Sequence, residues 1–138
     1  MNLAVLGVGS NIDARRHIAK ARELLTLEQT FLKESSFVAT TPIGASPQPD
    51  YLNGAFLVST KLDRDSFERY VKHLETRLGR VRTGDAYGPR TIDLDIVVWN
   101  GRIVNDDFHE RDFVRNAVKE LLPGLENAGK GPAPHVPF

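Results

Sequence analysis

The apolar residues of this chain form short runs that alternate with helical stripes. Residues 3–8 are an apolar run closed by a Gly-Ser-Asn turn, which is typical of a buried strand. Apolar side chains then recur at helical spacing in residues 14–27, and Asp13 occupies the position of a helix N-cap. Residues 51–62 repeat the strand pattern, and Asp63 opens a second helical stripe. The chain therefore contains two successive strand-and-helix units.

Weaker patterns complete the set of expected elements. Two segments, residues 41–50 and 80–90, are rich in proline, glycine or arginine and fit no regular element. Connections of this length in a small domain are usually functional loops. We expect further strands in residues 30–40, 92–99 and 102–104, a tight turn at Asn100 and Gly101, and a last helix in residues 109–122.

This order of elements predicts the fold class. Strand, helix, strand, strand, helix, strand is the split βαβ arrangement. We therefore expect an α+β protein, a ferredoxin-like sandwich with an antiparallel sheet and an added C-terminal helix. Residues 1–124 would form this single domain, and residues 125–138 an irregular tail.

Composition narrows the classes of function. The chain has 138 residues, of which 41% are hydrophobic, and this is enough for one compact core. Eighteen basic residues balance eighteen acidic ones, so no overall field attracts nucleic acid or a membrane surface. Cysteine is absent, which excludes disulfides and thiolate metal sites. Without a leader or a spanning segment, we expect a cytoplasmic monomer.

The densest chemical signal lies in the segment GPRTIDLDI, residues 88–96. Alternate side chains of a strand share a face, so Asp93 and Asp95 point to the same side. Two neighbouring carboxylates repel each other unless a cation neutralises them, and hard oxygen ligands suit Mg²⁺ bound by phosphates. An isolated pair of this kind more often faces solvent. The evidence for a site is the loop just before the pair, which carries three guanidinium groups suited to polyphosphate: Arg80, Arg82 and Arg90.

A second candidate group follows the proline-rich segment. Tyr51 and Asn53 are two residues apart and therefore lie on one strand face. An amide offers donors and an acceptor for the edge of a heterocycle, and an aromatic ring can stack on its plane. Considered alone, these residues would be ordinary strand positions. Their place beside the loop makes a ligand site the better interpretation.

Five segments together resemble a known family. They are GSN at residue 9, SSFVATTPIG at residue 35, QPDYLN at residue 48, GRVR at residue 79 and GPRTIDLDI at residue 88. In this order they are similar to the signatures of 6-hydroxymethyl-7,8-dihydropterin pyrophosphokinase, and they cover about residues 3–122. The fold that this resemblance implies is ferredoxin-like, in agreement with the pattern of elements.

The resemblance also implies a reaction and its ligands. The hydroxymethyl oxygen of a reduced pterin would attack the β-phosphorus of ATP and release AMP, with no protein nucleophile. Asp93 and Asp95 would hold two Mg²⁺ ions, and the three arginines would contact the phosphates. Near the nucleotide the resemblance adds Glu75 and Arg111. Around the pterin it adds Thr40, Pro42, Ile43, Tyr51, Asn53 and Phe113, with Tyr87 in a closing loop where many members carry tryptophan.

The chain departs from the family pattern before Arg111, where the segment NDDFHERDF is shortened. His109 is a candidate to replace a family histidine near ATP, although its spacing differs. Arg115 and Asn116 interrupt a segment that is usually apolar. A divergent member that binds a pterin or nucleotide without efficient turnover is therefore an alternative. RNA-binding RRM domains share the order of elements, but zero net charge and the lack of aromatics in residues 3–8 argue against them.

Overall fold

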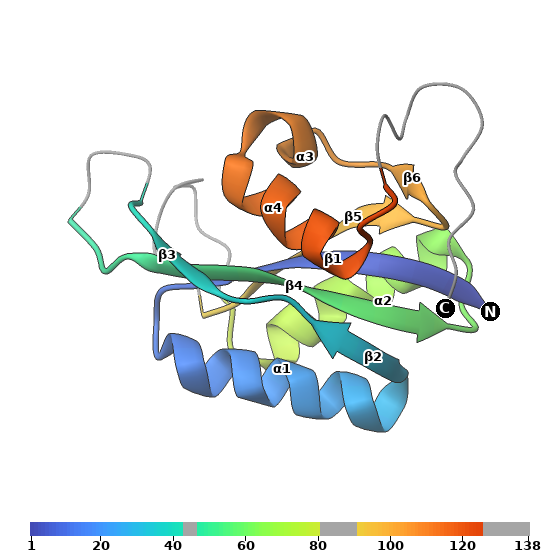
Figure 1. Cartoon of the computed structure of the whole chain (residues 1–138). Helices are drawn as coiled ribbons and strands as arrows, with labels where there is room; N and C mark the ends of the chain where they lie inside the picture. Colours follow the sequence, from blue (N-terminus) through green and yellow to red (C-terminus); the bar gives the residue numbers. More distant parts are fainter. Residues whose placement is uncertain (43–46, 81–90, 126–138) are drawn as a thin grey trace.

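The computed structural model describes residues 1–42, 47–80 and 91–125, and in this part of the chain six strands form one antiparallel sheet (Figure 1). None of the helices described there is long and apolar enough to cross a lipid bilayer. The elements in chain order are β1 (Asn2–Ser10), α1 (Ala14–Glu28), β2 (Thr30–Glu34), β3 (Val38–Thr40), β4 (Tyr51–Thr60), α2 (Arg64–Arg77), β5 (Asp93–Trp99), β6 (Arg102–Ile103), α3 (Asp107–Glu110) and α4 (Asp112–Leu121).

The strand order confirms the predicted fold class. The sheet has the order β2-β4-β1-β5-β6, and β3 also pairs with β4, beyond the end of β2. The first and third strand segments of the split βαβ pattern, β1 and β4, lie at its centre and pair along their whole length. All strand pairs are antiparallel. The chain is thus an α+β, ferredoxin-like sandwich with an antiparallel sheet.

The alternation of side chains along β1 divides the core into two layers. Ala4, Leu6 and Val8 pack with α1 and α2 on one face, whereas Leu3 and Val5 pack with α4 on the other. Figure 1 shows α1 and α2 on one side of the sheet and α3 and α4 on the opposite side. Helices therefore cover both faces of the sheet, and those on the α3 and α4 side are shorter.

The face that α4 covers loses its large side chains toward the end of β1. After Leu3 and Val5, the next two residues on this face are Gly7 and Gly9. Asp95 pairs with Gly7 and Asp93 with Gly9 across the sheet. Because glycine leaves the sheet surface bare, this end of the face forms a floor for a cavity.

The predicted turn between β5 and β6 is confirmed. Asn100 and Gly101 have φ angles of 48° and 83°, so both adopt the left-handed conformation that a two-residue hairpin needs. The side chain of Asn100 also accepts a hydrogen bond of 2.7 Å from the backbone N–H of Leu3. The turn thereby ties the last hairpin to the start of β1.

Two predicted elements are each divided in the structure. Residues 30–40 form β2 and β3. Between them the Ser35 N–H still donates to the Ala55 carbonyl at 2.9 Å, but the Ala55 N–H donates to the Ser35 hydroxyl at 2.8 Å and not to a strand carbonyl. The last helix is α3 and α4, because Arg111 between them has an extended backbone with φ −127° and ψ 115°. Four consecutive polar residues stand at each break, at 33–36 and 109–112, and the predicted elements ran through them.

The two helix starts differ, although an aspartate occupies both. The Asp63 carboxylate accepts from the N–H of Ser66 at 2.8 Å and caps α2. Asp13 stands at the N-cap position of α1 but has a left-handed φ of 43° and makes no capping hydrogen bond with its side chain.

Leu125, which the sequence analysis assigns to the irregular tail, is buried in the layer that contains α4.

Leu25 and Leu27 provide a matched test of the α1 layer. Leu25 is fully buried in the core, whereas Leu27, on the same helix, is 73% exposed. We predict that Leu25→Ala lowers the free energy of unfolding by about 2–5 kcal/mol, since it leaves a cavity. Leu27→Ala should change it by less than about 0.5 kcal/mol. Urea denaturation of both variants checks this, and equal losses would contradict the assigned core face.

Candidate active site

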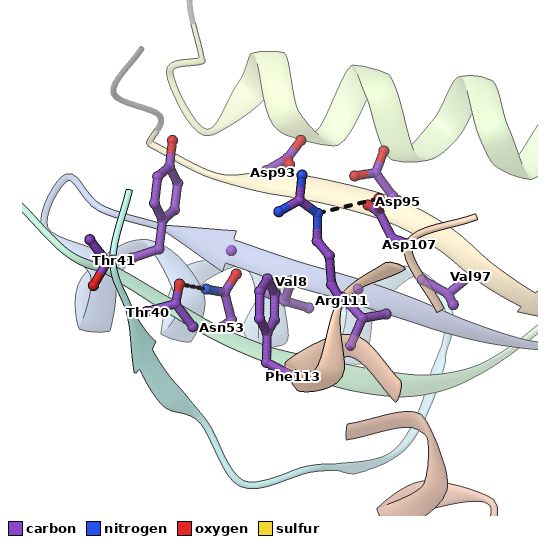
Figure 2. A pocket seen from close by; sticks show the side chains of 15 residues that line it. Val8, Thr40, Thr41, Asn53, Asp93, Asp95, Val97, Asp107, Arg111 and Phe113 are labelled. Carbon is purple, nitrogen blue, oxygen red and sulfur yellow. Dashed lines mark hydrogen bonds and ion pairs between the residues drawn. The ribbon is translucent and has the colours of Figure 1, made fainter. Parts of the chain in front are cut away.

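A cavity of about 220 Å³ lies on the bare end of the sheet, beside α3 and α4 (Figure 2). Its floor is β1, its sides are β4 and β5, and the segment from α3 to α4 covers it. It brings together residues that are up to about a hundred positions apart in the chain. The lining residues are Gly7, Val8, Gly9, Thr40, Thr41, Tyr51, Asn53, Gly54, Asp93, Asp95, Val97, Asp107, Arg111, Phe113 and Val114.

Asp93 and Asp95 line this cavity together, as the strand pattern predicts. Leu94 between them is fully buried in the layer under α1 and α2. The two carboxylates are 30% and 35% exposed, so they are reachable but partly withdrawn from water. Figure 2 shows them along the same stretch of β5.

The outer edge of β5 at this point is covered by side chains of α2. β6 pairs only with Val98 and Trp99, so the start of β5 has no strand beyond it in the described sheet. There the Leu94 N–H donates to the carboxylate of Glu75 at 2.6 Å, and the Leu94 carbonyl accepts from the ammonium of Lys72 at 2.9 Å. Two helix side chains thus take the place of a neighbouring strand.

The same edge holds cations next to the carboxylates. Arg80 Nη1 lies 2.6 Å from Asp93 Oδ1 and 3.1 Å from Glu75 Oε2. Lys72 Nζ lies 3.0 Å from Asp95 Oδ1 and 3.6 Å from Glu75 Oε2. The fully buried carboxylate of Glu75 therefore contacts both cations and the backbone of β5.

Burial and charge shift the protonation equilibria of these groups. Burial raises the pKa of Asp95, and the charge of Asp93 raises it further, while Lys72 acts in the opposite direction. Burial also raises the pKa of Glu75, although its hydrogen bond from Leu94 and the charges of Lys72 and Arg80 oppose the shift. For Lys72 burial would lower the pKa, but Asp95 and Glu75 outweigh it and the pKa is raised. The pair of carboxylates is thus a place that favours added positive charge.

The other end of the cavity carries the amide that the sequence singled out. Asn53 Nδ2 donates to the hydroxyl of Thr40 at 2.5 Å, which directs the amide oxygen toward β1 (Figure 2). Tyr51 and Phe113 line the same cavity from β4 and α4. One polar amide between aromatic residues suits a flat ring with hydrogen-bonding edges.

Several predicted site residues lie elsewhere. Glu75 lies behind the carboxylate strand rather than in the cavity lining, and it contacts the site through Arg80 and Lys72. Pro42 is half-buried and His109 is exposed, and neither belongs to the lining. His109 instead meets the ring of Phe108 edge to face. The predictions for Ile43, Arg82, Tyr87 and Arg90 fall outside the described residues.

Sequence reasoning missed three polar site residues. Lys72 sits on the polar side of α2, where a lysine is ordinary, and nothing local relates it to Asp95. Asp107 and Thr41 line the cavity, but neither carries a signal in its own segment. Only contacts between distant elements identify them.

Arg115, which interrupts an expected apolar segment, has a structural explanation. Its guanidinium donates to the carbonyls of Phe108 and His109 at 3.3 and 3.2 Å and pairs with Asp112. It therefore fastens the end of α3 onto α4. This holds in place the segment that covers the cavity.

The absence of a side chain at Gly9 leaves room for the amide of Asn53, and this gives a testable prediction. A Cβ at residue 9 would lie 2.7 Å from Asn53 Oδ1, so Gly9→Ala should push the amide away from Thr40. We expect a shifted Asn53 side-chain amide signal in NMR spectra and a loss of about 1 kcal/mol in the free energy of unfolding. Gly124→Ala, where nothing lies within 4 Å, is the control. An unmoved amide signal in Gly9→Ala would contradict this role.

Comparison with known proteins assigns the chain to a family. Residues 5–123 match the family described as 7,8-dihydro-6-hydroxymethylpterin-pyrophosphokinase (HPPK). The chain is 31% identical over 136 residues to the 2-amino-4-hydroxy-6-hydroxymethyldihydropteridine pyrophosphokinase of Haemophilus influenzae, which covers 91% of this chain and 84% of that protein. The Bacillus subtilis enzyme of the same name is 32% identical over 136 residues, with coverages of 91% and 81%.

A longer relative contains the same region. The folic acid synthesis protein FOL1 of Dictyostelium discoideum is 33% identical over 134 residues, which are 90% of this chain, but the chain spans only 20% of that protein. The bacterial relatives are matched over more than four-fifths of their length. On these grounds the chain belongs to the HPPK family.

Proposed function

We propose that this chain transfers a diphosphate group from ATP to the hydroxymethyl group of 6-hydroxymethyl-7,8-dihydropterin, with AMP as the second product, in folate synthesis. Membership of the family supports this reaction. The observation that carries it is a single cavity with the carboxylate pair at one end and the amide and aromatic residues at the other. A polyphosphate with its cations and a flat heterocycle would thus meet in one place.

The residues at the carboxylate end fit Mg²⁺. Asp93 and Asp95 offer hard oxygen ligands at an open cavity, and the raised pKa of Asp95, caused by burial and by Asp93, reflects a need for positive charge. In the part of the chain that the structure describes, no three acidic or histidine residues form a closed metal cage. We infer that Asp93 and Asp95 hold two Mg²⁺ ions whose other ligands are phosphate and water. Bound there, Mg²⁺ would neutralise charge on the triphosphate.

Guanidinium groups would complete the phosphate subsite. Arg80 is held beside the carboxylates by Asp93 and Glu75, so its position is fixed before a ligand arrives. Arg111 lines the cavity, where it faces the same strand (Figure 2). The family resemblance adds Arg82 and Arg90 to this group, and a role for His109 near ATP stays a prediction. Planar guanidinium groups bind phosphate oxygens in pairs, which aligns the chain for transfer.

At the other end, Asn53 would read the edge of the pterin. Its amide is oriented by Thr40, so the oxygen is presented as an acceptor. Tyr51 and Phe113 would enclose the ring, and Pro42, Ile43 and Tyr87 would complete the enclosure as the family resemblance implies. The amide would select for a ring edge that donates hydrogen bonds.

The transfer needs no protein nucleophile. The hydroxymethyl oxygen forms a bond to the β-phosphorus of ATP as its proton passes to solvent. The bond between that phosphorus and the oxygen bridging to the α-phosphate breaks, and its electron pair leaves with AMP. The protein aligns the reactants, neutralises their charge and excludes competing water.

We further propose that the chain acts in the cytoplasm as a monomer and binds no nucleic acid.

Asp95→Ala tests the reaction and its metal end together. We predict that the wild-type protein forms AMP from ATP, Mg²⁺ and the hydroxymethyl pterin, and that Asp95→Ala lowers this rate at least about 100-fold. The variant should keep its circular dichroism spectrum, since the side chain faces the cavity and not the core. Asp65→Ala, an exposed aspartate on α2, is the matched control. No AMP from the wild-type protein would favour a binding-only relative.

Asn53→Ala separates the two ends of the cavity. We predict that it weakens binding of the pterin about 10-fold or more, because the ring edge loses its partner. Binding of a non-hydrolysable ATP analogue should change less than about twofold, which calorimetric titration of each ligand measures. Asn2→Ala, at the opposite end of β1, should alter neither affinity. Equal losses for both ligands would argue against this assignment of the ends.

A further inference from the structure

Asp107 lies in the cavity, although neither the strand pattern nor the carboxylate pair points to it. It begins α3 and lines the cavity. Its carboxylate is 40% exposed and lies 3.5 Å from the guanidinium Nε of Arg111, which is 35% exposed. Figure 2 shows this contact within the cavity, next to Asp95.

Asp107 holds Arg111 from two directions. Its backbone carbonyl accepts from the Arg111 N–H at 2.9 Å, and its side chain faces the guanidinium. Arg111 has an extended backbone between two helices, and its side chain is 35% exposed. An unheld arginine at such a break would sample many rotamers. The contact with Asp107 selects those that point into the cavity.

Each carboxylate of the described cavity is paired with a different cation. Asp93 pairs with Arg80 at 2.6 Å, Asp95 with Lys72 at 3.0 Å, and Asp107 with Arg111 at 3.5 Å. The first two cations approach from the α2 side of β5. Among these three described cations, Arg111 is the one that approaches from the segment that covers the cavity, and its contact is the longest. It is therefore the pair that a phosphate chain would most easily open.

We propose that Asp107 is a positioning residue that holds Arg111 inside the cavity, so that its guanidinium is in place when phosphate oxygens arrive. This inference rests on the proposed function, because it takes the ligand to be the triphosphate of ATP. Arg111 then exchanges a carboxylate for a phosphate without searching for its conformation. Asp107 acts through Arg111 and does not itself touch the reacting atoms.

The experiment is a cycle of variants read by binding. We measure the Kd of α,β-methylene-ATP with Mg²⁺ by calorimetry for the wild-type protein, Asp107→Asn, Arg111→Met and the double variant. Asp107→Asn should bind about two- to fivefold more weakly, the range expected for a half-exposed ion pair. The same change in the Arg111→Met background should have no further effect, since the group it positions is gone.

Controls separate the possible failures. Asp106→Asn removes the same charge one residue away, from an exposed side chain outside the cavity lining, and should leave Kd unchanged. Tighter or unchanged binding by Asp107→Asn, or equal effects in both backgrounds, would overturn the inference while the proposed function stands. Absence of nucleotide binding by the wild-type protein would refute the proposed function instead.

A second measurement keeps the test decisive where Arg111→Met binds too weakly to titrate. The Arg111 Nε–H signal in NMR spectra of the ligand-free protein reports directly on the contact. Asp107→Asn should shift and broaden this signal, whereas Asp106→Asn should leave it in place. An unchanged signal in Asp107→Asn would show that the carboxylate does not hold the guanidinium.

Discussion

The site depends on how the backbone hydrogen-bonding groups at the open edge of β5 find their partners. Backbone N–H and C=O groups that lack partners in a partly buried place are costly, and the start of β5 has no described strand beyond it. Glu75 and Lys72, three residues apart on α2, give Leu94 an acceptor and a donor. Because the same two side chains also hold Arg80 and Asp95, the contacts that complete the sheet also arrange the charges of the cavity.

A fully buried carboxylate such as Glu75 is stable only with several partners. Its desolvation opposes ionisation, and the backbone of Leu94 together with two cations compensates for it. Removing any one of these partners would weaken that compensation. This interdependence makes the charges rigid, and rigid charges need less rearrangement when a ligand binds. Glu75 thus supports the carboxylate end of the cavity through Arg80 and Lys72, and its place near the nucleotide stays a prediction.

The features that could be predicted from the sequence are those that depend on local periodicity. Alternation along β5 and β4 placed Asp93 with Asp95 and Tyr51 with Asn53, and the order of elements predicted the fold. What it could not predict comes from contacts between elements. The breaks at Ser35 and Arg111 coincide with polar runs at 33–36 and 109–112, but a hydroxyl bond to Ala55 and a change of backbone angles make them, and neither can be read from a polar run alone. The lining residues Thr41 and Asp107 likewise carry no signal in their own segments, and neither does Lys72, which meets Asp95 from α2.

The pairing of each cavity carboxylate with its own cation bears on how a chain without net charge can hold a highly charged ligand. In the proposed complex, Mg²⁺ would add positive charge beside Asp93 and Asp95, and the triphosphate would add negative charge beside Arg80 and Arg111. The charges that the metal and the triphosphate bring to the site therefore offset each other. Affinity then comes from the number and alignment of the new contacts, which the glycine floor and the α2 edge set in advance. Selectivity for a metal-bound triphosphate over a bare anion follows, because an anion alone would leave Asp93 and Asp95 facing like charge.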